Sequence, residues 1–89
     1  MERIQLDCSQ MTDRDTAHEY LARVLDFPAW YGKNLDALYD MLTGHIPPME
    51  LELLHPWELE SMGDYGHSLL ETMQDAAIDN PDLVLILGT

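Results

Sequence analysis

The sequence has very few basic residues. Lysine and arginine together number 4 against 17 aspartates and glutamates, which gives the 89-residue chain a formal net charge of −13 at pH 7. A negative field of this size repels nucleic acid phosphates and anionic lipid surfaces, so we expect neither nucleic acid nor a membrane as a partner. A cationic protein is the natural complement, although acidity in many small proteins serves solubility alone.

Cysteine and long apolar runs are also scarce. Cys8 is the single cysteine, so the chain cannot form the internal disulfide that secreted domains of this size usually need. The start from Met1 to Gln5 lacks the basic and apolar regions of a secretory signal, and no apolar run approaches the length of about 18 residues that a membrane-spanning helix needs. These features predict a cytoplasmic protein. The length allows one domain, residues 1–89.

Motifs of the common chemical sites are missing as well. The spacing of His18, His45, His55 and His67 matches no metal-ligand motif, and we predict neither a metal nor a cofactor. There is no glycine-rich phosphate loop and no nucleophile motif, and residues 63–66 are interpreted as a hinge or turn. The sequence therefore gives little support to an enzyme.

What is present is a regular alternation of apolar patterns. Residues 4–8 alternate between apolar and polar side chains, which predicts a strand. Residues 17–25 carry apolar side chains at helical spacing, and Thr12 with Asp15 resembles a capping pattern before them. We therefore expect a first helix that ends near Phe27.

A second helix is predicted over residues 34–43. Asn34 is a good N-cap residue, and Gly44 stands where a C′ glycine belongs. After two prolines, residues 49–53 alternate apolar and acidic side chains, which indicates a strand with one face in water. The middle of the chain is thus a helix followed by a strand.

The last third of the chain repeats this order. Residues 56–62 are expected to form a short helix that begins with a proline, and apolar spacing over 69–77 predicts a longer helix that ends at Asn80. The unbroken apolar run 83–87 predicts a buried central or parallel strand. Because the connections between strands are too long for hairpins, we predict a single α/β domain with a three-stranded parallel sheet and about four helices.

The second helix carries an unusual pair of acids. At about 100° per residue, Asp36, Tyr39, Asp40 and Thr43 fall within one wedge, opposite the leucines. Asp36 and Asp40 stand at i, i+4, where like charges weaken a helix by about 0.2–0.5 kcal/mol. Asp36 in the first turn also favours the helix dipole, but Asp40 lies past the middle of the helix and gains nothing from it. The pair therefore indicates a binding surface.

Aromatic residues accompany these acids. Tyr39 lies between them, and Trp30 with Tyr31 precedes the helix; tyrosine and tryptophan are preferred anchors at interfaces, although any one of them equally suits a core position. An alternative is an enzyme in which Asp36 and Asp40 act as an acid and base pair. The prediction that both acids lie on an exposed helix face, where carboxylates stay ionised, argues against it.

Residues 30–44, read as Trp-Tyr-Gly-Lys-Asn-Leu-Asp-Ala-Leu-Tyr-Asp-Met-Leu-Thr-Gly, resemble the recognition segment of the barstar family of ribonuclease inhibitors. The order of predicted elements extends the resemblance over the whole chain. It implies an intracellular inhibitor that binds a basic, barnase-like secreted ribonuclease in a 1:1 complex. The second helix and its preceding loop would plug the active site of the nuclease, and the free inhibitor would be a monomer.

The resemblance also implies roles for individual residues. Asp40 would stand in for a substrate phosphate among the basic groups of the nuclease, and Asp36 would pair with a neighbouring base. Asp75 in the last helix would be a peripheral acidic contact, and Asp79 falls where a second acid lies. The partner-binding residues implied in this way are Trp30, Asn34, Asp36, Tyr39, Asp40, Thr43, Gly44, His45 and Asp75.

Some positions depart from the family pattern. Tyr39 stands where the prototype has tryptophan, His45 replaces an aromatic residue, and Lys33 replaces an acid. These differences keep a second hypothesis open, in which the same fold is an interaction module that binds another basic protein or toxin.

Overall fold

The computed structural model describes all residues from 1 to 89. Three strands, β1 (Glu2–Asp7), β2 (Met49–Leu54) and β3 (Leu83–Leu87), form one sheet in the order β1-β2-β3. Both pairs are parallel, with Ile4 opposite Leu51 and Leu51 opposite Leu85. The predicted α/β class and the three-stranded parallel sheet are therefore confirmed.

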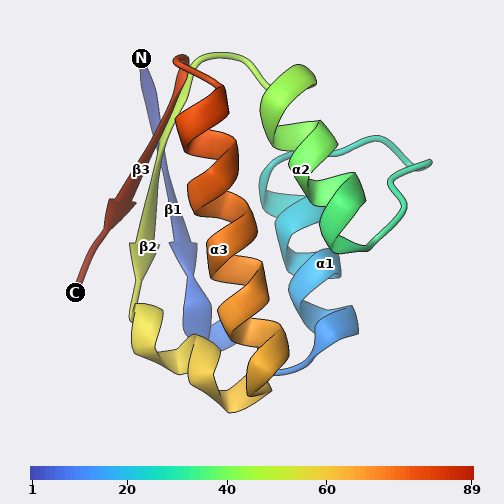
Figure 1. The fold of residues 1–89 in the computed structure, drawn as a ribbon, viewed down its shortest axis with the longest axis vertical. Helices are drawn as coiled ribbons and strands as arrows, with labels where there is room; N and C mark the ends of the chain where they lie inside the picture. The colour runs from blue at the N-terminus through green and yellow to red at the C-terminus, as the bar shows by residue number, and fades with distance from the viewer.

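Helical segments form the crossovers between these strands. A short 3-10 turn, η1 (Cys8–Gln10), and the helices α1 (Arg14–Val24) and α2 (Leu35–Gly44) connect β1 to β2. The 3-10 helix η2 (Pro56–Met62) and the helix α3 (Asp64–Asp79) connect β2 to β3. Figure 1 shows the three α-helices on the same side of the sheet, with α2 packed beside α3. This arrangement follows because right-handed crossovers that proceed in one direction place their helices on the same face.

The core fills the space between the sheet and these helices. Met49, Leu51 and Leu53 of β2 are buried and alternate with Glu50 and Glu52, which lie on the opposite face. Because the helices cover only one side, the other face of the sheet is polar at β1 and β2. There the Arg3 guanidinium lies 3.4 Å from a Glu50 carboxylate oxygen, and Gln5 donates a hydrogen bond of 3.0 Å to Glu52.

The predicted ends of the first two elements need correction. β1 ends at Asp7, one residue before the predicted end at Cys8, because the Asp7 carboxylate accepts a hydrogen bond from the Ser9 amide and starts η1. The N-cap of α1 is Asp13 and not Thr12: the Asp13 carboxylate accepts from the Thr16 amide at 2.8 Å. Both acids satisfy amides that would otherwise lack a partner at the start of a helix.

The glycines behave differently from the sequence-based expectation. Gly44 is the last residue of α2, and His45 is the C-cap, so Gly44 is not a left-handed C′ residue. Gly63 has a positive φ of 62°, which fits a turn, but α3 already begins at Asp64 and contains Gly66. A β-carbon on Gly66 would lie 1.9 Å from the Leu59 carbonyl oxygen. Gly66 therefore allows α3 to pack closely on η2, and residues 63–66 are not a hinge.

The strand β3 is parallel as predicted but is not central. It pairs only with β2 and forms one edge of the sheet. Only Leu83 of β3 is buried, whereas Val84 is 39% and Leu87 is 54% exposed. The apolar run did not distinguish a central strand from an edge strand because all five side chains are apolar on both faces of the sheet.

Candidate partner-binding face

The helix α2 begins with a side-chain cap. The Asn34 carboxamide oxygen accepts a hydrogen bond of 2.7 Å from the Ala37 amide, and its nitrogen donates to the Gly32 carbonyl oxygen at 3.3 Å. Buried Leu38, Met41 and Leu42 hold the inner side of the helix in the core. The predicted N-cap is thus confirmed, and both ends of the Asn34 side chain are engaged in positioning the helix.

The outer side of α2 presents the two aspartates. Asp36 and Asp40 are both exposed, and neither forms an ion pair with a residue of this chain. Tyr39 lies between them, half-buried against the core. Thr43 is also half-buried, and its hydroxyl donates to the Tyr39 carbonyl oxygen at 2.8 Å. Thr43 therefore uses its hydroxyl within the helix, whereas the carboxylates of Asp36 and Asp40 form no ion pair within the chain.

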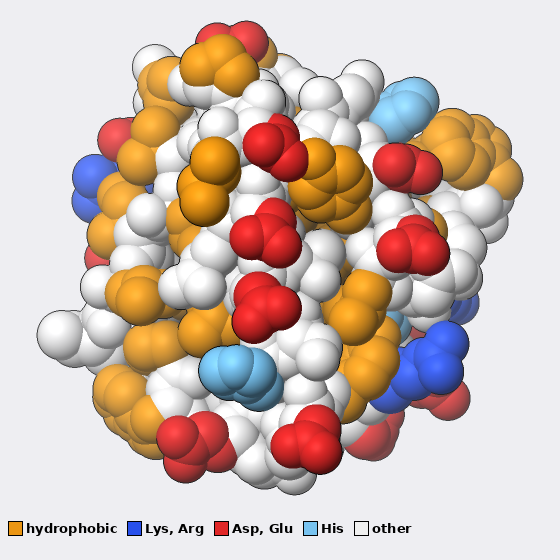
Figure 2. All heavy atoms as spheres, in the orientation of Figure 1, with side chains coloured by type: hydrophobic (Ala, Val, Ile, Leu, Met, Phe, Trp, Pro, Cys, Tyr) orange, Lys and Arg blue, Asp and Glu red, His pale blue; other side chains and the backbone are white.

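The helix α3 completes this surface with two more acids. The Tyr39 hydroxyl donates a hydrogen bond to the Asp79 carboxylate, and the exposed Asp75 lies near enough to influence Tyr39. We define Asp36, Asp40, Asp75 and Asp79 with Tyr39 at their centre as the acidic face. Figure 2 shows acidic side chains in two rows over α2 and α3, with no lysine or arginine between the rows.

The negative charge of the acidic face affects the pKa of Tyr39. The hydrogen bond to Asp79, partial burial, and the charges of Asp79, Asp75 and Asp40 raise the pKa of Tyr39 above its ordinary value. Each cause opposes a second negative charge at this position. The acidic face thus has a negative potential that a cation from a partner would relieve.

The sequence analysis assigns Asp79 only a secondary role, although the spacing of Asp75 and Asp79 indicates that they form a second acidic pair. Asp75 and Asp79 stand at i, i+4 on α3, the same like-charge spacing that singled out Asp36 and Asp40. What the sequence could not show is that α3 packs beside α2, so that the two pairs of acids share one surface.

The other predicted contacts border α2 at its two ends. Trp30 is 67% exposed in the loop before α2, and its ring centroid lies 5.6 Å from that of the exposed His45, at an interplanar angle of 79°. The edge-to-face contact joins the loop to the C-terminal end of the helix. Gly44 is exposed beside them, and no atom lies within 4 Å of a β-carbon built on it. The structure therefore brings Trp30 and His45 together, and Gly44 precedes His45 in the chain.

A buried histidine anchors the loop that carries Trp30. His18 of α1 is fully buried, with its Nδ1 atom 2.7 Å from the Tyr31 hydroxyl and its Nε2 atom 2.5 Å from the Tyr65 hydroxyl. Burial, together with the charges of Arg14 and Lys33, lowers the pKa of His18. Tyr31 is therefore a core residue, and this three-residue cluster was not predicted from the sequence.

The remaining histidines lie apart from one another. His45 contacts Trp30, the ring of His55 lies 5.3 Å from that of Trp57, and His67 lies 3.9 Å from Glu71. No group of three metal-ligating side chains comes together in the structure.

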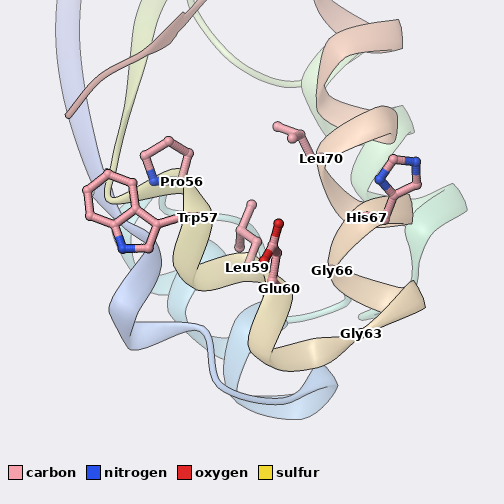
Figure 3. A pocket seen from close by; sticks show the side chains of 8 residues that line it. All are labelled: Pro56, Trp57, Leu59, Glu60, Gly63, Gly66, His67 and Leu70. Atoms are coloured by element: carbon pink, nitrogen blue, oxygen red, sulfur yellow. The ribbon is translucent and has the colours of Figure 1, made fainter.

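The hollows of the surface lie away from the two aspartates of α2. One hollow of about 280 Å³ lies between η2 and α3, where Figure 3 shows Trp57, Glu60 and His67 among its lining residues. Neither Asp36 nor Asp40 lines this hollow or the other two. Both carboxylates therefore lie on an open part of the surface, outside the hollows of the kind that enclose small ligands.

Fold and surface together define a class: a small α/β domain with an acidic two-helix face. Comparison with known proteins gives its family. The family model described as Barstar (barnase inhibitor) matches residues 1–85, and the chain belongs to this family. It is also 38% identical over 79 residues to a protein of Bacillus subtilis (strain 168) named "Putative ribonuclease inhibitor YrdF", across 85% of this chain and 86% of that protein. Barstar-family proteins are inhibitors and not enzymes.

No helix of the structure is both long enough and apolar enough to cross a membrane.

Proposed function

We propose that this protein is an intracellular inhibitor of a basic secreted ribonuclease, and that α2 with its preceding loop plugs the active site of the nuclease. The observation that carries the proposal is the pair Asp36 and Asp40, exposed on one side of α2 without a cationic partner in their own chain. Like charges at i, i+4 weaken the free helix, and a basic partner would convert that cost into binding energy. Family membership and the name of the Bacillus subtilis relative support the same function.

Asp40 is the central residue of the proposed interface. Its carboxylate would occupy the position of a substrate phosphate among the basic groups of the nuclease, and Asp36 would pair with a neighbouring cation. A carboxylate that loses its water in such a site gains strong charge-assisted hydrogen bonds from arginine or lysine. Because the acidic face extends to α3, Asp75 would meet basic groups at the periphery.

The uncharged neighbours would shape the contact around this centre. Trp30 and His45 offer an exposed apolar rim, and Tyr39 offers the outer part of its ring. Asn34 and Thr43 already use their polar groups to hold α2, so their contribution to a partner is contact area and correct placement of the aspartates. Gly44 leaves open space where the partner can approach.

The proposed location and stoichiometry follow from the same function. An inhibitor that protects its own cell meets the nuclease in the cytoplasm before export and binds it one to one. A net charge of −13 attracts a basic nuclease over long distances and raises the encounter rate. This long-range attraction weakens as salt screens it.

A second candidate is an interaction module of the barstar fold that binds a different basic protein or toxin. It is favoured by Tyr39, His45 and Lys33, which differ from the family prototype on or beside the proposed interface. Because Lys33 places a positive charge next to the acidic face, it would oppose a partner that is uniformly basic around its active site.

A titration of the purified protein into several small basic microbial ribonucleases, with RNA cleavage as the readout, tests the proposal. We expect cleavage by at least one nuclease to fall linearly to zero at one equivalent of inhibitor. If none of the nucleases is inhibited but the protein binds a different basic partner through α2, the interaction module is the correct function.

A further inference from the structure

The two edges of the sheet differ in a way that the proposed function does not explain. The strand β1 forms one edge and carries the charged residues Glu2, Arg3 and Asp7. The strand β3 forms the other edge and contains only leucine, valine and isoleucine. Charged side chains on an edge strand discourage pairing with other chains, and such protection is missing at β3.

Apolar side chains are exposed around the β3 edge. Val84 is 39% exposed and Leu87 is 54% exposed, and Ile78 of the neighbouring helix α3 is 79% exposed. A hollow of about 450 Å³ between α3 and β3 is lined by Ala77, Ile78, Leu85 and Leu87, with Gln74 and Asp75 also in its wall. Figure 2 shows hydrophobic side chains along the margin of the molecule where Figure 1 places β3. Exposed apolar side chains gathered in this way are typical of an interaction surface.

The shape of this edge selects an extended strand as its occupant. An edge strand directs half of its backbone amides and carbonyls away from the sheet, and these groups bind another strand through a ladder of hydrogen bonds. A helix laid along this edge would not pair with the outer backbone groups of β3. The binding element is therefore a β-strand with apolar side chains on both faces.

We propose that the β3 strands of two copies of this protein pair antiparallel across a two-fold axis and form a six-stranded sheet in a homodimer. The segment Leu-Val-Leu-Ile-Leu is nearly symmetric about Leu85. Antiparallel pairing centred there places Leu83 opposite Leu87 of the other copy and Val84 opposite Ile86. Leucines then meet leucines on the helix-covered face, and β-branched residues meet on the open face, where such pairs stabilise a sheet.

The charge distribution is compatible with a second copy at this edge and at few other places. The chain carries 17 acidic residues, but none lies within 83–89, and the symmetric pairing places Asp82 opposite the uncharged Gly88. In Figure 1, β3 lies on one side of α3 and α2 on the other, so two copies joined at β3 would keep their α2 surfaces apart. A two-fold contact of this kind also closes on itself, leaving no further edge for chain growth at β3.

The small contact area sets the strength of the dimer. Stable complexes bury about 800 Å² on each partner, and a pair of five-residue strands with a few neighbouring side chains supplies less. Two chains that each carry −13 also repel one another. The dimer is therefore weak, is populated at high protein concentration, and becomes stronger as salt screens the repulsion. At high protein concentration and high salt we therefore expect the free protein to form a dimer and not to remain a monomer.

Sedimentation equilibrium over a wide range of protein concentration, at low and at high salt, tests the proposal with two matched variants. Val84→Lys places a cation on the β3 edge, and Gln5→Lys places the same cation on the same sheet face at β1. Both variants lower the net negative charge equally, which by itself would favour association. We expect wild type and Gln5→Lys to dimerise more tightly at high salt, and Val84→Lys to lose at least tenfold in dimer affinity.

Amide hydrogen exchange gives a second measurement that does not depend on the variants. We expect the outward-facing amides of β3 in the wild type to exchange more slowly as protein concentration rises, while those at the outer edge of β1 do not change. A wild type that stays monomeric at the highest concentration and salt overturns the proposal. So does a dimer that Val84→Lys leaves intact. Neither result bears on nuclease inhibition, because the dimer strengthens with salt and the nuclease complex weakens with it.

Discussion

Tyr39 on α2 donates a hydrogen bond to the carboxylate of Asp79 on α3, and this contact makes the acidic face a surface of two helices. A second bond nearby reinforces it, since the Asn80 carboxamide donates to the Leu42 carbonyl oxygen at 2.9 Å. The exposed aspartates of α2 are therefore held by the packing of α2 on α3 as well as by the Asn34 cap.

The bond between Tyr39 and Asp79 predicts the titration of Tyr39. We expect Asp79→Asn to return the pKa of Tyr39 toward the ordinary value of about 10, because the substitution removes both the charge and the carboxylate acceptor. The ring resonances of Tyr39, followed by NMR as a function of pH, report this change. Asp75→Asn is the control and should lower the pKa less, since Asp75 acts through its charge alone. Equal effects of the two variants would mean that the hydrogen bond is absent in solution.

His18 predicts how stability depends on pH. Its pKa is lowered in the folded protein by burial, with smaller effects of Arg14 and Lys33, so the unfolded chain binds the proton more readily. The free energy of unfolding should therefore fall as pH decreases below about 6.5, the ordinary histidine pKa, until the pH is below the folded-state pKa. Asp7 and Asp13 also have lowered pKa values, but their contribution is lost only near and below the ordinary aspartate pKa of 3.8.

Urea unfolding measured at a series of pH values tests this expectation. His18→Gln should remove the loss of stability between about pH 6.5 and pH 5, whatever its effect at pH 7. His67→Gln is the matched control, because it makes the same substitution at a histidine whose side chain is 82% exposed. A wild-type profile that is flat over this range would contradict the role assigned to His18.

Gly66 and Gly44 make a paired prediction about helix glycines. Gly66→Ala should destabilise the protein by about 1–3 kcal/mol, because its β-carbon would lie 1.9 Å from the Leu59 carbonyl oxygen and force α3 away from η2. Gly44→Ala, where the new methyl meets no atom within 4 Å, should be neutral or stabilise the helix by up to about 1 kcal/mol. Thermal or urea unfolding of the two variants measures the difference. Equal effects would show that α3 does not approach η2 so closely.

Much of the fold could be predicted from the sequence because its elements carry local signals. The type and position of Asn34 predict the N-cap of α2, and the alternation of apolar and acidic residues in 49–53 predicts β2 with one face in water. Local signals also indicate the topology here, since long connections between successive strands are typical of parallel pairing. The order of strands within the sheet was not predicted, and the run 83–87, predicted as a buried central or parallel strand, is parallel but lies at an edge.

In the candidate site too, relationships within one helix could be predicted and contacts between helices could not. The wedge from Asp36 to Thr43 followed from helical geometry, because its members belong to one element. The contact of Tyr39 with Asp79 joins residues 40 positions apart and depends on the packing of α2 against α3. For the same reason the cluster of His18, Tyr31 and Tyr65 was missed. Each of these residues looks ordinary in the sequence, and only the tertiary structure brings the three together.

Ionic strength should separate the two associations proposed for this protein. The rate of association with a basic ribonuclease should fall steeply as salt increases, because the Debye length shortens from about 30 Å at 0.01 M to about 8 Å at 0.15 M. Stopped-flow measurement at several salt concentrations gives the slope. Glu58→Ala, which removes an exposed acid on η2 far from α2, should reduce the rate only slightly. A rate that does not respond to salt would contradict electrostatic steering by the acidic face.

The central claim is that Asp40 is the principal binding residue of a ribonuclease inhibitor, and inhibition by Asp40→Ala tests it most directly. Asp40→Ala is titrated into the nuclease that the wild type inhibits. It should lose at least about 2 kcal/mol of binding free energy, which is roughly 30-fold in Kd. This is the usual threshold for an interface hot spot, and the barstar interface is itself a reference case for such residues. Its free energy of unfolding should stay within about 0.5 kcal/mol of the wild type, because Asp40 is exposed. Equal inhibition by Asp40→Ala and wild type would contradict the claim.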